Sequence, residues 1–199
     1  MRRRFRLGMV VLAIALMLGA STARASLITG GYCPGAGQPF AQFGDFRSYV
    51  FGTNGGLEAG SSGWTFAGDS SVVKGNESYF VHSRYDSHSL RLGSGASATT
   101  PPMCMGTSST VIRFFVANAA PGTLRVQVVE RNLLGTVIGV VDWTSLSGVS
   151  GWKPSPAVVN LDSLLGALGV SSVQLRFTAS GGAWQVDDVY VDPWESRGA

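Results

Sequence analysis

The chain has 199 residues, and 15 Lys and Arg against 12 Asp and Glu give it a formal charge of +3. Five of the arginines and none of the acids lie within the first 25 residues, so the rest of the chain carries 10 basic against 12 acidic side chains, a formal charge of −2. Because neutralising phosphates requires a clustered excess of Lys and Arg, this balance argues against a nucleic-acid partner.

The first 25 residues have the pattern of a cleaved secretory signal. Four arginines among residues 2–6 precede an apolar run at 7–20, and Ala23-Arg24-Ala25 places small residues at the two positions that a signal peptidase reads. A retained membrane anchor is the alternative, but a membrane span requires about 20 apolar residues. No second long apolar run follows. We therefore expect a secreted, extracellular mature chain without a membrane span.

The two cysteines, Cys33 and Cys104, both lie in the part of the chain expected to be exported. An oxidising compartment favours a disulfide between them. Such a bond would close a loop of about 70 residues and stabilise the fold by about 4 kcal/mol in the chain-entropy model. It would tie the N-terminal extension to the body of the domain. Two free thiols or a metal pair are the alternatives, and a metal would need His82 and His88 as further ligands.

Beyond the signal, short runs of β-branched and aromatic residues are separated by clusters of Gly, Ser, Pro and Asn. This spacing predicts an all-β fold. The predicted strands, in chain order, are 48–51, 64–67, 71–74, 89–92, 111–117, 124–130, 137–143, 173–179 and 185–191. Apolar and polar residues alternate within several of them, so one face of each strand points to a core and the other to water. The pattern predicts an antiparallel β-sandwich of two sheets.

One short helix is predicted near residues 160–168, where leucines recur at helical spacing and Gly169 follows as a stop signal. Pro154 and Pro156 cannot lie in a central strand, so they mark a loop or a sheet edge. The predicted organisation is a signal at 1–25, an extension at 26–53 packed on the sandwich, the sandwich at 54–192 and a frayed tail at 193–199.

Two stretches have features of catalytic or nucleotide-binding motifs. Residues 93–98 fit the letters of a dinucleotide-binding glycine pattern, but prolines follow where a helix would have to begin, so we interpret them as a turn. The segment from His82 to His88 also contains Asp86, and it offers a base and its carboxylate partner to a hydrolase. No G-x-S-x-G elbow accompanies it. A solvated loop is the alternative interpretation, and we expect no catalysis.

Two motifs near the ends of the predicted sandwich resemble a known family. Residues 54–64 read N-G-G-L-E-A-G-S-S-G-W, and residues 184–192 read W-Q-V-D-D-V-Y-V-D. They resemble the opening motif N-G-G-F-E-x-G-x-x-x-W and the closing motif I-D-D-V of galactose-binding-like jelly-roll domains, the fold of many carbohydrate-binding modules. Leu57 stands where the family usually has Phe, and Val186 stands where it often has Ile. Both exchanges keep an apolar side chain, so the resemblance implies a jelly-roll β-sandwich.

The mature chain as a whole also resembles a group of secreted actinobacterial proteins without an assigned function. The likeness covers Cys33, Gly44-Asp45, residues 89–92, Cys104 and residues 113–115. It agrees with export and with the expected fold, but it implies no activity.

In many jelly-roll binding modules, acids that match Glu58 and one of Asp187 or Asp188 help to hold a structural calcium ion. Calcium prefers several oxygen ligands, and it could pin the first strand to the last. Consecutive residues of a flat strand point to opposite faces, so only one of the two aspartates could face Glu58. The alternative is that these acids form caps, turn hydrogen bonds or surface salt bridges.

The resemblance also implies a polysaccharide or cell-wall glycan as the partner. Sugars stack on aromatic rings in such modules, and the best candidates for an exposed platform are Tyr79, Tyr85, Trp143 and Trp152, whereas Trp64 and Trp184 belong to the motifs and are expected in the core. We therefore expect a secreted, non-catalytic carbohydrate-binding protein. The alternatives are an extracellular structural or adhesion protein with no small ligand, and a hydrolase that uses the His82–His88 segment.

Overall fold

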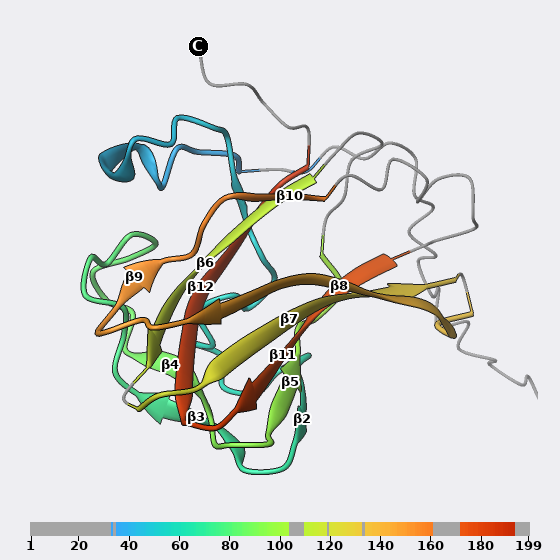
Figure 1. Ribbon diagram of the computed structural model, residues 1–199. Helices are drawn as coiled ribbons and strands as arrows, with labels where there is room; N and C mark the ends of the chain where they lie inside the picture. The colour runs from blue at the N-terminus through green and yellow to red at the C-terminus, as the bar shows by residue number, and fades with distance from the viewer. Residues whose placement is uncertain are drawn as a thin grey trace, which may run out of the picture.

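Two antiparallel sheets pack face to face in the computed structural model of the chain, as Figure 1 shows. The structure describes residues 33, 35–103, 110–118, 120–132, 134–160 and 172–193, with the backbone alone at 110 and 158–160. The all-β jelly-roll sandwich expected from the sequence is confirmed. Helical structure among these residues is limited to the 3-10 turn η1 (Ala41–Phe43), and they include no helix that is long and apolar enough to cross a membrane.

Among the described residues, one sheet has seven strands. They are β1 (Val50–Phe51), β3 (Ser70–Lys74), β4 (His88–Leu92), β6 (Thr110–Asn118), β9 (Lys153–Pro154), β10 (Val158–Asn160) and β12 (Trp184–Asp192). The order along the sheet is β10-β6-β12-β4-β3, with β1 also paired to β12 and β9 also paired to β6. The last strand of the chain therefore lies in the middle of this sheet.

The other sheet has five strands. They are β2 (Thr65–Ala67), β5 (Ser97–Thr99), β7 (Thr123–Arg131), β8 (Val137–Ser147) and β11 (Ser172–Ser180), in the order β2-β5-β11-β7-β8. The central strand, β11, pairs with β7 over its whole length. The main core lies between the two sheets, where Phe114 and Phe177 meet edge to face with ring centroids 5.0 Å apart.

A second apolar cluster lies on the outside of the seven-stranded sheet, where residues 37–49 cover β6 and β12. Phe40 is fully buried, and its ring stacks on Phe115 with centroids 5.5 Å apart. Beside it, Arg113 donates to the carboxylate of Asp45 at 2.8 Å, and the Tyr49 hydroxyl donates to the same oxygen at 2.8 Å. The described part of the N-terminal extension thus packs on the sandwich through both apolar and ionic contacts.

All nine predicted strands are present, with ends that differ by a few residues. Three short strands, β5, β9 and β10, were not predicted, because two or three residues are too few to show an alternating pattern. Pro154 ends β9, which agrees with the expected sheet edge. The predicted signal, the helix at 160–168 apart from Asn160, Cys104 and nearly all of the tail lie outside the described residues, so these predictions and the disulfide remain predictions.

Candidate functional site

The first sequence motif folds into a series of tight turns held by Asn54. The Asn54 amide donates to the carbonyls of Gly60 and Ser62 at 2.9 and 3.0 Å, and its side-chain oxygen accepts from the Ala59 amide at 3.1 Å. The indole of Trp64 donates to the Asn54 carbonyl at 3.0 Å. Trp64 is buried, as expected for a motif residue that belongs to the core.

These turns bring Gly55 and Gly56 against β12, where that strand is irregular. The pairing of β12 with β6 shifts its register between Asp187 and Tyr190, and Asp188 adopts a left-handed φ of 46°. The strand is therefore not flat, and both aspartates lie beside the same glycine. A Cβ added at Gly56 would lie 2.9 Å from Asp188 Oδ1 and 3.7 Å from Asp187 Oδ1. In a flat strand Asp187 and Asp188 would point to opposite faces, but the bulge lets both side chains face one site.

A third acid joins these two from the loop between β3 and β4. Glu77, Asp187 and Asp188, called the acid cluster below, have no exposed surface. The Glu77 amide donates to Asp187 Oδ2 at 2.8 Å, and the Asp188 amide donates to Asp187 Oδ1 at 2.9 Å. The His82 amide donates to Asp188 Oδ2 at 3.2 Å, whereas the buried Asp188 Oδ1 has no hydrogen-bond partner. One oxygen of the cluster is thus unsatisfied.

The acid cluster is electrostatically costly as it stands. Burial raises the pKa of Asp187, and the charges of Asp188 and Glu77 raise it further. Burial also raises the pKa of Asp188, and the charge of Glu77 adds to it. The pKa of Glu77 is raised by burial although the amides of Val81 and Tyr79 donate to its carboxylate. Among the described residues no Lys or Arg forms an ion pair with the cluster, so its negative charge is unbalanced.

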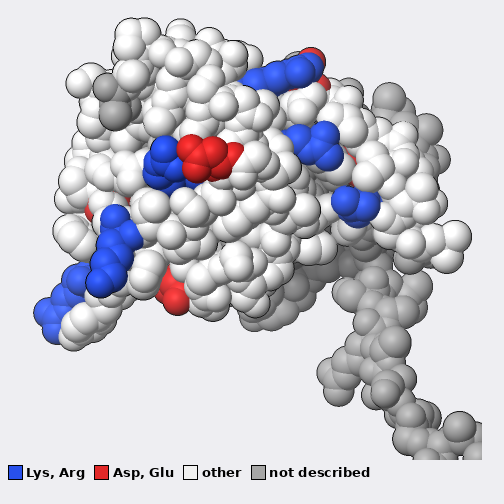
Figure 2. Space-filling view, turned by 90° about the horizontal axis from the view of Figure 1, so that it is seen from below, with Lys and Arg blue, Asp and Glu red and all other residues white. Residues whose placement is uncertain are grey.

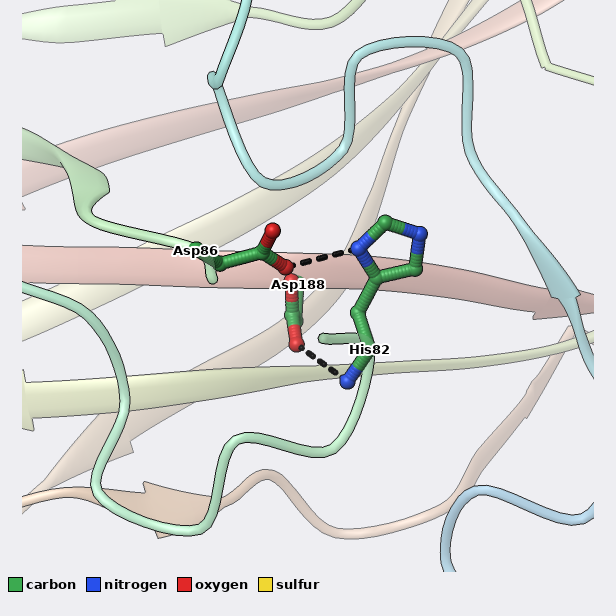
Figure 3. Close-up of side chains that lie close together, drawn as sticks. All are labelled: His82, Asp86 and Asp188. Atoms are coloured by element: carbon green, nitrogen blue, oxygen red, sulfur yellow. Dashed lines mark hydrogen bonds and ion pairs between the residues drawn. The ribbon is translucent and has the colours of Figure 1, made fainter. Parts of the chain in front are cut away.

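His82 and Asp86 lie next to Asp188 of the acid cluster, as Figure 3 shows. His82 Nδ1 is 2.7 Å from Asp86 Oδ2, and the imidazole stacks on the Phe51 ring with centroids 3.7 Å apart. One ligand atom from each of His82, Asp86 and Asp188 lies within 4.8 Å of the other two. Nitrogen and oxygen donors from the loop and from β12 therefore converge at this point.

This arrangement fits a divalent cation. The donors of the cluster are carboxylate oxygens, which calcium prefers, and an unpartnered buried oxygen is already in place. A cation would also balance the buried negative charge that raises the pKa values of Asp187 and Asp188. Asp86 would contribute to such a site together with Asp188, and the sequence analysis did not connect the two because they lie far apart in the chain.

Glu58, the other predicted calcium ligand, makes different contacts. Its carboxylate accepts from the amides of Ser87 and His88 at 2.8 and 2.7 Å, and it lies 3.0 Å from His88 Nδ1. These hydrogen bonds lower the pKa of Glu58 despite its partial burial. Glu58 therefore joins the first motif to the start of β4, and it does not belong to the group formed by His82, Asp86 and Asp188.

Two of the four predicted platform aromatics come together. Tyr79 is 41 % exposed, and its hydroxyl donates to the Trp152 carbonyl at 3.3 Å. The Tyr79 ring packs edge to face on Phe43, with centroids 4.9 Å apart, and its centroid is 5.7 Å from that of Phe115. Trp152 is half-buried against the second apolar cluster. Tyr79 and Trp152, called the aromatic ledge below, come from two loops on the outside of the seven-stranded sheet.

The other two aromatics do not join the ledge. Tyr85 is 75 % exposed, and the Arg84 guanidinium lies 4.7 Å from its ring centre. Trp143 is on β8 in the other sheet, where it packs partly buried against the main core. Neither lines the hollow of about 500 Å³ at the end of the sandwich, which is formed by residues 118, 120–122 and 147–150. The four candidates thus lie in three separate places.

The geometry around the two histidines is not that of a hydrolytic triad. Ser87 Oγ lies 3.1 Å from His88 Nδ1, but Glu58 lies 3.0 Å from the same nitrogen. A catalytic histidine contacts its nucleophile and its orienting carboxylate through opposite ring nitrogens. His82 has Asp86 on Nδ1, and no described serine hydroxyl hydrogen-bonds to its ring.

Charged groups are scattered over the face drawn in Figure 2. Lys, Arg, Asp and Glu appear there as small separate groups in a largely uncharged surface. That face has no continuous basic patch of the kind that nucleic-acid binding requires. The expectation that nucleic acid is not a partner remains a prediction.

Comparisons with known proteins support the fold. The chain matches no protein-family model and no curated protein. One similar solved structure is that of the CBM22-1-GH10 modules of Clostridium thermocellum xylanase 10B complexed with xylohexaose. The TM-score is 0.50 at 13% identity, and the match covers 74% of this chain and 28% of that chain. A second similar structure is the CBM22-1-CBM22-2 tandem domain from Paenibacillus barcinonensis Xyn10C, with a TM-score of 0.50 and 16% identity. The match covers 77% of this chain and 48% of the tandem domain.

The chain therefore spans less than half the length of each of these two structures. The chain is also similar to a single domain, the CBM22-1 xylan-binding domain from Paenibacillus barcinonensis Xyn10C, with a TM-score of 0.45 and 16% identity. That match covers 65% of this chain and 85% of the domain. At such identities the likeness concerns the fold alone. The two structures with a TM-score of 0.50 confirm the sandwich fold that the motifs at its two ends implied.

Proposed function

We propose that the protein is a secreted, non-catalytic module that binds a polysaccharide or cell-wall glycan on the aromatic ledge. The observation that carries the proposal is the environment of Tyr79. Its ring is exposed on one side and held on the other by Phe43 and Phe115, while its hydroxyl is fixed by the Trp152 carbonyl.

A ring held in this way suits the apolar face of a sugar. Aromatic side chains combine a large apolar area with few rotatable bonds, so a ring that is already immobilised loses little further entropy on binding. The half-buried Trp152 extends the apolar surface beside Tyr79, and its indole adds a hydrogen-bond donor.

A structural calcium ion in the acid cluster is part of the same proposal. Asp188 and Asp86 would ligate it with His82 beside them, and the ion would supply the positive charge that the neighbouring buried carboxylates lack. Its place between β12 and the loop after β3 would fix the segment that carries Tyr79, because Tyr79 follows Glu77 by two residues. The cation is thus expected to support the ledge rather than to contact the ligand.

Retention on insoluble polysaccharides tests the proposal. The protein is mixed with xylan, galactan, cellulose or isolated cell walls, and the bound fraction is measured after sedimentation. At least one polymer should retain the wild type, and Tyr79→Ala or Trp152→Ala should reduce retention by about tenfold or more, since each removes a large stacking surface. Tyr85→Ala is the matched control, because Tyr85 is more exposed but lies outside the ledge.

Two results would overturn the proposal. The first is a wild type that no polymer retains, which would favour a structural or adhesion protein without a small ligand. The second is retention that Tyr79→Ala and Trp152→Ala leave unchanged while both variants keep the melting temperature of the wild type. Release of soluble sugars during the incubation would favour a hydrolase instead.

A further inference from the structure

The outer face of the five-stranded sheet carries a row of polar side chains that crosses all five strands. The pairing register aligns Thr65, Thr99, Arg176, Gln127 and Asp142 in this order from β2 to β8. The inward row next to it contains Phe66, Ala98, Phe177 and Val126, which belong to or pack against the main core. The polar row therefore faces away from the core on every strand.

Arg176 occupies the centre of this row. It lies on the middle strand, β11, between Thr99 of β5 and Gln127 of β7. The side chain is half-buried, yet its guanidinium forms no hydrogen bond or ion pair with any described residue. A planar group with five N–H donors is thus held in the middle of a sheet face with only neutral partners beside it.

The one acid of the row is already engaged. Asp142 accepts from Arg125 Nε and Nη2 at 2.6 and 2.5 Å and from Gln127 at 3.1 Å. Arg131, also on β7, donates to Gln174 Oε1 and to the Gly135 carbonyl. Three arginines against one aspartate give this face an excess of positive charge, although the chain beyond residue 25 is negative overall. Arg176 is the member of the three that remains available to a ligand.

Among the described residues, aromatic side chains are absent from this row and from the next outward row beside it. The second row contains Ala67, Ser97, Thr178, Arg125 and Ser145. Stacking on a sugar ring is therefore not available on this face, unlike on the ledge. The chemistry that it offers is hydrogen bonding from hydroxyls, amides and a guanidinium, and the strongest such interaction is a paired bond from arginine to an anionic oxygen pair.

We propose that the outer face of the five-stranded sheet is a second glycan-binding site, in which Arg176 binds a negatively charged substituent and Gln127 binds an adjoining sugar hydroxyl. The substituent is a carboxylate, sulfate or phosphate, all of which present the oxygen pair that a guanidinium recognises. The inference rests on the proposed function in one respect, that the ligand is a glycan. A nucleic acid fits less well, because one available arginine is too few for a phosphate backbone.

Matched polymers test this site. Binding of the protein to polygalacturonate is measured by affinity electrophoresis against its methyl-esterified form, which has the same backbone without the charge. Dextran sulfate against dextran, and phosphomannan against mannan, identify the preferred anion. We expect the anionic member of at least one pair to bind about tenfold or more tightly than its neutral partner. Arg176→Gln should abolish the difference, and Arg176→Lys should retain part of it, because Lys keeps the charge but loses the planar fork.

Arg91→Gln is the matched control. Arg91 lies on β4 in the other sheet, is equally half-buried and is bound to Asp69 at 2.9 Å, so this variant removes the same charge elsewhere. It should leave anionic binding unchanged. The site would be overturned if Arg91→Gln and Arg176→Gln weakened binding of the anionic polymer equally. It would also be overturned if the wild type bound duplex DNA as tightly as the anionic polymer, because either result indicates general adsorption of polyanions. Equal binding of the two members of every pair by the wild type would overturn it as well.

The same variants separate this proposal from the ledge. Tyr79→Ala should leave the preference for anionic polymers intact, and Arg176→Gln should leave retention on neutral polysaccharides intact. If neutral retention fails while the anionic preference persists, the ledge is wrong and the arginine site stands.

Discussion

The backbone amide of Glu77 donates to the carboxylate of Asp187 at 2.8 Å, across 110 residues of sequence. This bond fixes the loop between β3 and β4 against the last strand. It also places the Glu77 carboxylate beside Asp187 and Asp188, so three acids share one buried site without a basic partner among the described residues. The arrangement is unfavourable unless a cation or protons balance it.

Calcium removal should therefore destabilise the protein. We expect a chelator at pH 8 to lower the melting temperature by several degrees, because the folded state then loses the bound ion and keeps buried acids without a counter-charge. Added calcium should restore the melting temperature in a concentration-dependent manner, as for any ligand that binds the folded state alone. Differential scanning calorimetry with and without chelator measures the effect. A melting temperature that neither chelator nor calcium changes would argue against the site.

Asp188→Asn should have opposite effects in the two conditions. With chelator at pH 8, it removes one buried negative charge and should raise the melting temperature above that of the wild type. With calcium, it removes a ligand and should abolish the calcium response. Glu58→Gln is the control, because Glu58 bonds to Ser87 and His88 and should leave the calcium response nearly intact. Loss of the response in Glu58→Gln alone would restore Glu58 as the ligand.

Gly56→Ala tests the close approach of the first motif to β12. The added Cβ would lie 2.9 Å from Asp188 Oδ1, so either the loop or the bulge must move. Such overpacking costs about 1–3 kcal/mol. We expect a lower midpoint in urea unfolding, with a weaker calcium response. Gly37→Ala is the control, since a Cβ there would meet no atom within 4 Å, and it should be nearly neutral. Equal effects of the two substitutions would contradict the close approach.

The fold followed from the sequence because its strands are long and alternate clearly. In β7 and β11, apolar residues recur at every second position, and they face the main core as expected. The three short strands could not be predicted in this way, because their pairing depends on long neighbours already in place. Trp64 and Trp184 were assigned to the core from the motifs alone, and both are buried.

The candidate site was only partly predictable. The sequence indicated Asp187 and Asp188, but their shared orientation depends on a β-bulge, and bulges depend on tertiary pairing rather than on local sequence. Glu77 approaches them only through a loop that folds back from β3. The aromatic ledge likewise depends on two loops about 70 residues apart in the chain, a proximity that strand patterns do not encode.

Because the carboxylate of Asp45 is buried and hydrogen-bonded, we expect the free energy of unfolding to fall in acid. Burial opposes its ionisation, but hydrogen bonds from Tyr49, Arg47 and Arg113 outweigh that effect and hold the pKa of Asp45 below its ordinary value. A lowered folded-state pKa means that the carboxylate stabilises the protein above the unfolded-state pKa of about 3.9, and that this contribution is lost as the pH falls through the folded-state pKa.

Asp45→Asn isolates this contribution. At pH 6 the variant should melt well below the wild type, because it leaves the buried Arg113 without its ionic partner. The difference should shrink between pH 4 and pH 2 as the wild-type carboxylate takes up its proton. Asp142→Asn is the control, since its ion pair with Arg125 is exposed and such pairs contribute little. A difference between Asp45→Asn and wild type that does not depend on pH would contradict the assignment.

The last prediction concerns Cys33, the first described residue of the N-terminal extension, which is buried in the main core. If it pairs with Cys104, the oxidised protein should not react with a maleimide after unfolding, and it should gain two labels after reduction. Reduction should lower the free energy of unfolding by about 4 kcal/mol, because the bond closes a loop of about 70 residues in the unfolded chain. Cys104→Ser should reproduce the loss and make it insensitive to reductant. Two labels on the unfolded, unreduced wild type would show free thiols instead.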